Sequence, residues 1–235
     1  MAEPTASIRA DVVDRDTEHS SSNDATPPRE HIALGDALPY VAATIGALWM
    51  FRSVFSGQLP GNIGDARWTV ALHEHWYRVW QGDAALRDLP SFYPVEGTLG
   101  TSDAFFAQGQ IYAALRTFGA GMIDSWTLTQ FLTFLFGTLG LAALSRRTLT
   151  TVWGRVAFVA LCATSYPVYL QLGHVQLFAI FWPAWIIVAA IDFAADRRRV
   201  LSATVLAVLP PVLALSSWYV FVLFFLLTAL FLLVR

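Results

Sequence analysis

The feature that most constrains this chain is a series of six apolar stretches, each close to the length that crosses a lipid bilayer. A transmembrane helix needs about 20 mostly apolar residues. Because the bilayer core cannot satisfy an open backbone, stretches that span it as separate segments fold as helices. The six stretches are Leu38–Leu59, Ser125–Ser145, Val152–Leu170, His174–Asp192, Val200–Ser216 and Trp218–Val234. The sequence therefore predicts an all-α, polytopic membrane protein with about six spans.

Composition supports a membrane protein and excludes a nucleic-acid-binding one. The chain is 56% hydrophobic and 14% charged, whereas about a quarter of the residues in a soluble domain are charged. The net charge is only -2, so the sequence lacks the strongly basic balance that marks a nucleic-acid partner. Membrane lipids are the partners that this composition predicts.

The boundary between the last two apolar stretches has two interpretations. Ser216-Ser217 separates them by a predicted tight turn, and Pro210-Pro211 predicts a kink within the fifth stretch. The alternative is that both stretches form one long, tilted helix.

The beginning of the chain differs in composition from the rest. Its first 33 residues are rich in Asp, Glu, Ser, Thr and Pro and contain no apolar run. Such a segment buries too little apolar surface to offset the entropy of ordering it. We therefore expect residues 1–35 to be a disordered tail, residues 36–235 to form the transmembrane domain, and the first span to be an uncleaved signal anchor.

Arginine placement predicts the orientation in the membrane. Arg146-Arg147 with Arg155 flank one connection between spans, and Arg197-Arg198-Arg199 flank another. Two spans separate the clusters, so both lie on one side, which the positive-inside rule makes cytoplasmic. We expect a multi-pass protein of the plasma membrane with a cytoplasmic N-terminus and an extracytoplasmic loop over residues 60–124.

The outer loop contains a predicted amphipathic helix that begins near an acidic residue. Trp68, Leu72, Trp76 and Trp80 recur at the spacing of one helical face, and aromatic residues favour the membrane interface. Asp65 stands at the start of this pattern. It is either a helix cap, a role for which Asp is well suited, or a catalytic carboxylate at the mouth of a membrane cavity.

His73-Glu74-His75, on the same helix, gives weak support for a metal site. Zinc-binding helices place two histidines four residues apart on one face, and residues two apart point about 200° away from each other. We interpret His73 and His75 as solvated interfacial residues. Glu74 comes nine residues after Asp65, half a turn off, so the two acids share a site only if Asp65 lies outside the helix.

Other polar groups also fall on the predicted outer side. Ser102-Asp103 precedes a second interfacial helix pattern at Ile111–Phe118, which it is placed to cap. Gln171, His174 and Gln176 are either simply solvated or line a polar pocket, and Arg52 either snorkels or binds a lipid phosphate. Phe92-Tyr93-Pro94 is predicted to be an extended aromatic loop.

Several short motifs, in a fixed order, resemble a known superfamily. They are Gly64-Asp65-Ala66-Arg67, Glu74-His75, Phe92-Tyr93-Pro94, Ser102-Asp103, Gly173-His174-Val175-Gln176 and Trp218-Tyr219. Over roughly residues 36–220 the chain resembles bacterial membrane proteins of the GT-C glycosyltransferase superfamily, including YfhO-like members.

This resemblance implies a fold of many membrane helices with a large first outer loop. It also implies transfer of a sugar from a polyprenyl-phosphate donor to a glycan or lipid acceptor on the outer face. An acid of the first outer loop then acts as general base or binds a divalent metal ion, the one cofactor implied. That acid corresponds to Asp65, with Glu74 or Asp103 as a second one. The substrate-binding residues predicted with it are Arg52, Arg67, His75, His174, Gln176 and Tyr219.

Other functions stay open at this point. A transporter or lipid flippase would line a pathway with Arg52, His174 and Gln176, and a non-catalytic accessory subunit is the third possibility. Members of the superfamily are usually much longer, and this chain stops at Arg235 directly after an apolar run. We therefore expect it to be the N-terminal part of a larger protein, a truncated gene product or one half of a split protein.

Overall fold

A computed structural model describes residues 34–52, 55, 63–89, 95–101, 103–165 and 174–234, and all of its regular elements are helices. In chain order they are α1 (Leu34–Met50), α2 (Ile63–Gln81), the 3-10 helix η3 (Thr98–Thr101), α3 (Phe106–Thr117), α4 (Met122–Thr148), α5 (Val152–Ala163), the 3-10 helix η4 (Val175–Phe181), α7 (Pro183–Ala194), α8 (Arg199–Ser216) and α9 (Trp218–Val234). The predicted all-α membrane fold is confirmed.

The helices divide by length into two groups. Three are long and apolar enough to cross a membrane: Met122–Thr148, Gln176–Ala194 and Arg199–Ser216. Three other apolar helices are shorter, at Leu34–Met50, Val152–Ala163 and Trp218–Leu233. Each of the six predicted stretches thus contains an apolar helix, but only three of these helices reach spanning length within the described residues. The predicted tail lies outside the described residues up to residue 33, and α1 begins at Leu34.

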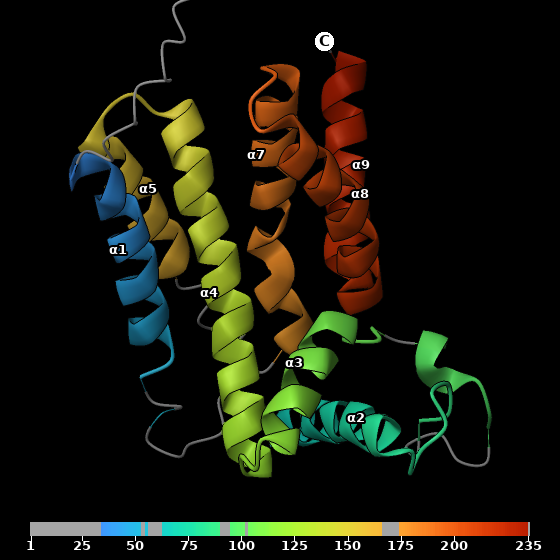
Figure 1. Cartoon of the computed structure of the whole chain (residues 1–235). Coiled ribbons are helices and arrows are strands. Elements are labelled where there is room, and N and C mark those ends of the chain that lie inside the picture. The colour runs from blue at the N-terminus through green and yellow to red at the C-terminus, as the bar shows by residue number, and fades with distance from the viewer. Residues whose placement is uncertain are drawn as a thin grey trace, which may run out of the picture. The chain divides into compact units, whose positions relative to one another are not determined.

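Helix α4 organises the bundle because it contacts α1, α5, α7 and η4 (Figure 1). Two α4 glycines allow close contact with the η4–α7 segment. A Cβ atom at Gly137 would lie 2.9 Å from the Cβ of Phe181, and one at Gly140 would lie 2.8 Å from Cδ1 of Trp185. The indole Nε1–H groups of Trp182 and Trp185 donate to carbonyl oxygens of α4, at 3.0 and 2.8 Å. These contacts fix the membrane helix that follows His174.

One end of the bundle is rich in ion pairs. Asp36 of α1 lies 3.3 Å from Arg146 and 3.1 Å from Arg155. Arg147, at the C-terminal end of α4, donates to both carboxylate oxygens of Asp192 near the end of α7, at 2.7 and 2.8 Å. The arginines of the α4–α5 and α7–α8 connections therefore gather at the same end.

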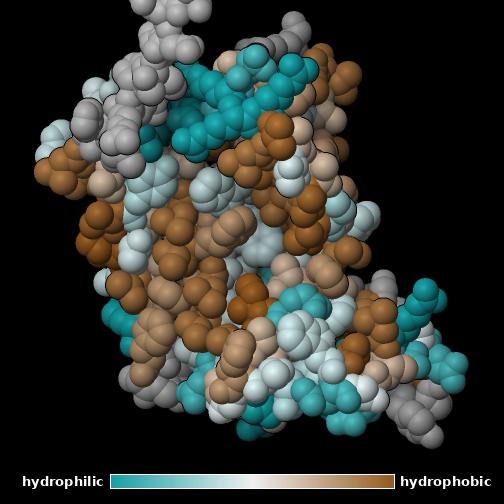
Figure 2. Space-filling view, viewed as in Figure 1, coloured by the Kyte–Doolittle hydropathy of each residue, from teal (hydrophilic) through white to brown (hydrophobic). Residues whose placement is uncertain are grey.

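Figure 2 shows that hydrophilic residues colour the two ends of this face, with a hydrophobic zone between them. Exposed apolar side chains are expected for helices that contact lipid. On α9 they include Leu223, Leu226, Leu227, Leu230 and Phe231, each at least 48% exposed. A hydrophobic zone between two hydrophilic ends is the surface pattern of a membrane-associated protein.

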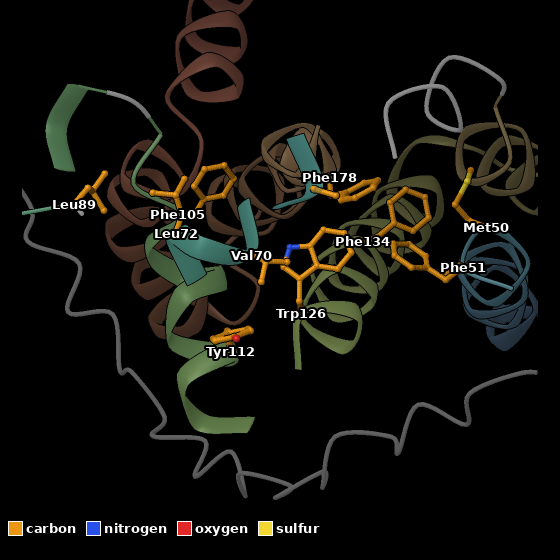
Figure 3. Packing of buried hydrophobic residues seen from close by; sticks show 12 residues of the cluster. Met50, Phe51, Val70, Leu72, Leu89, Phe105, Tyr112, Trp126, Phe134 and Phe178 are labelled. Carbon is orange, nitrogen blue, oxygen red and sulfur yellow. The ribbon is translucent and has the colours of Figure 1, made fainter. Parts of the chain in front are cut away.

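The other end carries α2 and α3, which pack on each other and on the start of α4 (Figure 1). A buried aromatic cluster joins this pair to the bundle. Figure 3 shows Phe51, Phe134 and Phe178 beside one another and Trp126 beside Val70 of α2. The predicted amphipathic helix around Trp68–Trp80 is confirmed as α2, and the Ile111–Phe118 pattern corresponds to α3.

The connection between α8 and α9 is a sharp break. Ser217 is extended, with φ -151° and ψ 94°, between helices that end at Ser216 and begin at Trp218. The predicted turn is therefore confirmed, and a single long helix is excluded. Helix α8 is continuous through Pro210 and Pro211.

Candidate functional site

Asp65 lies within the first turn of α2, because the helix begins at Ile63. Its carboxylate is not at the cap position that the simpler interpretation gave it. The carboxylate still stabilises the helix, since a negative charge in the first turn interacts favourably with the exposed N–H groups there. The side chain is 48% exposed, which leaves the carboxylate accessible to a ligand.

His174 comes from the second half of the chain and meets Asp65. Its Nε2 lies 3.5 Å from Oδ2 of Asp65, and the imidazole is 47% exposed. His174 directly precedes η4, which continues into the membrane-length helix over Gln176–Ala194. The structure thus places a carboxylate and an imidazole, both accessible, where the α2–α3 end meets a membrane helix.

Glu74 belongs to a different cluster on α2. Its carboxylate accepts from the Tyr112 hydroxyl at 2.5 Å and from two nitrogens of Arg116 at 3.2 and 3.3 Å. Asp65 lies inside the helix, so the nine residues between the two acids turn them about 180° apart. Glu74 therefore does not share a site with Asp65, and it ties α2 to α3.

Glu74 contributes to a rise in the pKa of both of its partners. Burial, reinforced by the hydrogen bond to Glu74, raises the pKa of the Tyr112 phenol. The same carboxylate raises the pKa of Arg116. Neither Tyr112 nor Arg116 was among the residues predicted from the sequence. The signal that could have identified them is their spacing, four residues apart on one face of the α3 pattern.

The prediction that His73 and His75 are solvated is wrong. Their side chains are 0% and 2% exposed, because α3, α4 and the segment after α2 cover this helix. His73 Nδ1 lies 2.6 Å from the Thr69 carbonyl oxygen and its Nε2 3.3 Å from the Gln130 amide. Burial lowers the pKa of His73 to about 4, although the Thr69 hydrogen bond opposes it. The ring is neutral at pH 7, with Nδ1–H donating to Thr69.

His73 should make the stability of the fold fall in mild acid. Its folded-state pKa of about 4 lies below the ordinary histidine pKa of 6.5. The stabilisation that the neutral ring gives the fold is therefore present above pH 6.5 and is lost as the pH falls toward 4. The difference corresponds to about 3 kcal/mol. We expect the thermal midpoint in detergent to drop less between pH 7 and pH 4.5 for His73→Gln than for the wild type. His174→Gln, which changes an exposed ring, should keep the wild-type drop. A His73→Gln drop equal to the wild-type drop would contradict this assignment.

His75 is fixed less completely than His73. Its Nε2 lies 3.3 Å from the Leu86 carbonyl oxygen. Its Nδ1 is buried and has no hydrogen-bond partner among the described residues. A buried polar atom of this kind usually has a partner, so Nδ1 marks a place where a ligand atom or water would be favourable.

Asp103 is also buried, at 5% exposure, and it caps α9. Its Oδ1 accepts from the backbone N–H of Trp218 at 2.7 Å. Burial raises the pKa of Asp103, and backbone hydrogen bonds from Trp218 and Tyr219 partly offset that shift. Asp103 was predicted to cap the following helix, α3, but it caps α9, which lies more than a hundred residues further along the chain. The Tyr219 side chain itself is 68% exposed.

The predicted cationic residues separate in space. Arg52 folds back on Trp49: its Nη1 donates to the Trp49 carbonyl oxygen at 2.6 Å, and its guanidinium lies 4.1 Å from the ring centre. Arg67 instead lines a surface hollow together with His75. Gln176, half-buried, follows His174 by two residues. Gln171, Ser102 and the Phe92-Tyr93-Pro94 motif lie outside the described residues.

The described residues do not by themselves form a metal site. No three His, Cys, Asp or Glu side chains among them are grouped closely enough to hold an ion. Asp65 and His174 are two donors, fewer than the three protein ligands of a typical catalytic zinc site.

No protein-family model, curated protein or solved structure matches the chain.

Proposed function

We propose that this protein is a membrane glycosyltransferase, or part of one, that takes a sugar from a polyprenyl-phosphate donor. The acceptor is a glycan or lipid on the extracytoplasmic face of the plasma membrane. The observation that carries the proposal is the 3.5 Å contact between Asp65 and His174. It joins two of the motifs on which the resemblance to the GT-C superfamily rests.

The chemistry of transfer fits an accessible carboxylate at this position. The acceptor hydroxyl oxygen attacks the anomeric carbon of the donor sugar and loses its proton to Asp65, the general base. The bond between that carbon and the phosphate oxygen breaks, and polyprenyl phosphate leaves with the electron pair. His174 is a positioning residue that holds the carboxylate, and the Gln176 amide offers hydrogen bonds to sugar hydroxyls.

The proposed orientation puts the arginine-rich end of the bundle in the cytoplasm. Arg146 and Arg155 lie there with Asp36, and Arg147 lies there with Asp192. The positive-inside rule favours the cytoplasmic side for these arginines. The Asp65–His174 pair then faces outward, within reach of a donor whose lipid tail stays in the membrane. Multi-pass topology is part of the same proposal.

A transporter is supported less well by the distribution of charge. Ionisable groups that serve a transport pathway lie deep in spans. In the three described helices of spanning length, Asp124, Arg146, Arg147, Asp192 and Arg199 all lie within or next to the first or last turn.

Proteoliposomes separate the two functions directly. The purified chain is reconstituted with a radiolabelled polyprenyl-phosphate sugar and an acceptor glycan supplied outside. Transfer of label to the acceptor supports the proposal. Movement of the labelled lipid between leaflets without transfer would favour a flippase and would overturn it.

A further inference from the structure

A second candidate site lies on a different face of α2 from Asp65. It is a surface hollow of about 560 Å³. Its lining residues are Arg67, Val70, Ala71, Glu74, His75, Arg78, Met122 and Ile123. Arg67 follows Asp65 by two residues, which turns it about 200° away around the helix. The hollow is therefore separate from the Asp65–His174 pair.

The hollow carries uncompensated positive charge. Arg67 and Arg78 are both exposed, and neither guanidinium has an ion pair or hydrogen bond within the described part of the chain. Glu74 also lines the hollow, but its charge is balanced by Arg116. Two free guanidinium groups bind phosphate oxygens well, because they donate paired, charge-assisted hydrogen bonds.

The opposite wall of the hollow is apolar and belongs to a membrane helix. Met122 and Ile123 are 43% and 39% exposed, and they are the first residues of α4, which is long enough to span a bilayer.

The size of the charged face favours a headgroup over a single ion. Arg67 and Arg78 are eleven positions apart on α2, which corresponds to about 16 Å along the helix. One phosphate ion does not span that length, whereas a phospholipid headgroup with its glycerol lies along it. The buried His75 ring borders the same hollow, and its Nδ1 has no hydrogen-bond partner among the residues that the structure describes.

We propose that this hollow binds the headgroup of an anionic phospholipid of the surrounding membrane. Arg67 and Arg78 contact its headgroup at two points along α2, and the beginning of its acyl chains lies against Met122 and Ile123. The site is independent of the transfer reaction. Lipid bound there anchors the α2–α3 pair to the bilayer surface at the N-terminal end of α4.

Native mass spectrometry of the purified full chain tests the site. The protein in detergent is titrated with dioleoyl-phosphatidylglycerol and, in parallel, with zwitterionic dioleoyl-phosphatidylcholine. We expect tighter binding of phosphatidylglycerol, weakened about tenfold or more in the double variant Arg67→Gln/Arg78→Gln. Each single variant should weaken binding, whereas Arg87→Gln, an equal change at an exposed arginine outside the hollow, should not.

Three results would overturn the proposal. They are equal binding of the two lipids, wild-type binding by the double variant, and displacement of phosphatidylglycerol by millimolar inorganic phosphate, which would indicate a site for the free ion. Asp65→Asn should retain lipid binding. Lipid binding and sugar transfer are thus separate readouts, and either proposal can fail without the other.

Discussion

Asp65→Asn is expected to lower the rate of sugar transfer at least a hundredfold while the protein stays folded. The amide has nearly the shape of the carboxylate but cannot take a proton from the acceptor hydroxyl, and general base catalysis contributes about 10²–10⁴-fold to a rate. The structural cost is small because Asp65 is 48% exposed, and a contact between exposed side chains of this kind contributes about 0–1 kcal/mol.

The measurement is the initial rate of transfer in proteoliposomes, with the thermal midpoint of each variant recorded in the same detergent. Asp83→Asn is the matched control, since Asp83 is an exposed acid in the segment just after α2. Asp83→Asn should transfer at the wild-type rate. Wild-type transfer by Asp65→Asn would remove the catalytic assignment.

Gly109→Ala is expected to disrupt the packing of α2 against α3. A Cβ atom at Gly109 would lie 2.1 Å from Cδ1 and 2.4 Å from Cγ of Trp76. The indole cannot simply move aside, because it is 5% exposed and its Nε1–H donates to the Ala104 carbonyl oxygen at 2.8 Å. Overpacking of a buried position costs about 1–3 kcal/mol, and a rigid ring at this distance puts the cost near the upper end.

Thermal unfolding and limited proteolysis in detergent measure this effect. Gly35→Ala is the control, because its Cβ atom would meet only the two methyl groups of Val152, at 3.2 and 3.9 Å. The double variant Gly109→Ala/Trp76→Leu should recover part of the lost stability, since the smaller side chain leaves room for the methyl group. Equal thermal midpoints for Gly109→Ala and Gly35→Ala would contradict the packing described here.

Local patterns in the sequence were enough to predict most of the helices. Apolar runs predicted α4 and α8 closely, and the repeated tryptophans of the Trp68–Trp80 segment predicted α2. Both signals depend only on neighbours along the chain. The break at Ser217 followed from local sequence in the same way.

The arrangement of the polar groups depended on contacts between distant segments. Asp103 was placed as a local cap but accepts a hydrogen bond from Trp218, in another helix. His73 was expected in solvent because it is polar, but α3 and α4 cover it. Helical spacing indicated that Asp65 and Glu74 could share a site only if Asp65 lay outside the helix, and Asp65 lies inside it. It could not identify Tyr112 and Arg116 as the partners of Glu74.

A double-variant cycle on Asp65 and His174 tests the central claim, that these two residues act as one site in sugar transfer. Transfer rates are measured for the wild type, Asp65→Asn, His174→Gln and the double variant. We expect each single variant to be slow and the double variant to be no slower than Asp65→Asn, because His174 acts through the Asp65 carboxylate. If the two losses multiply instead, the residues act independently and the proposed site is wrong.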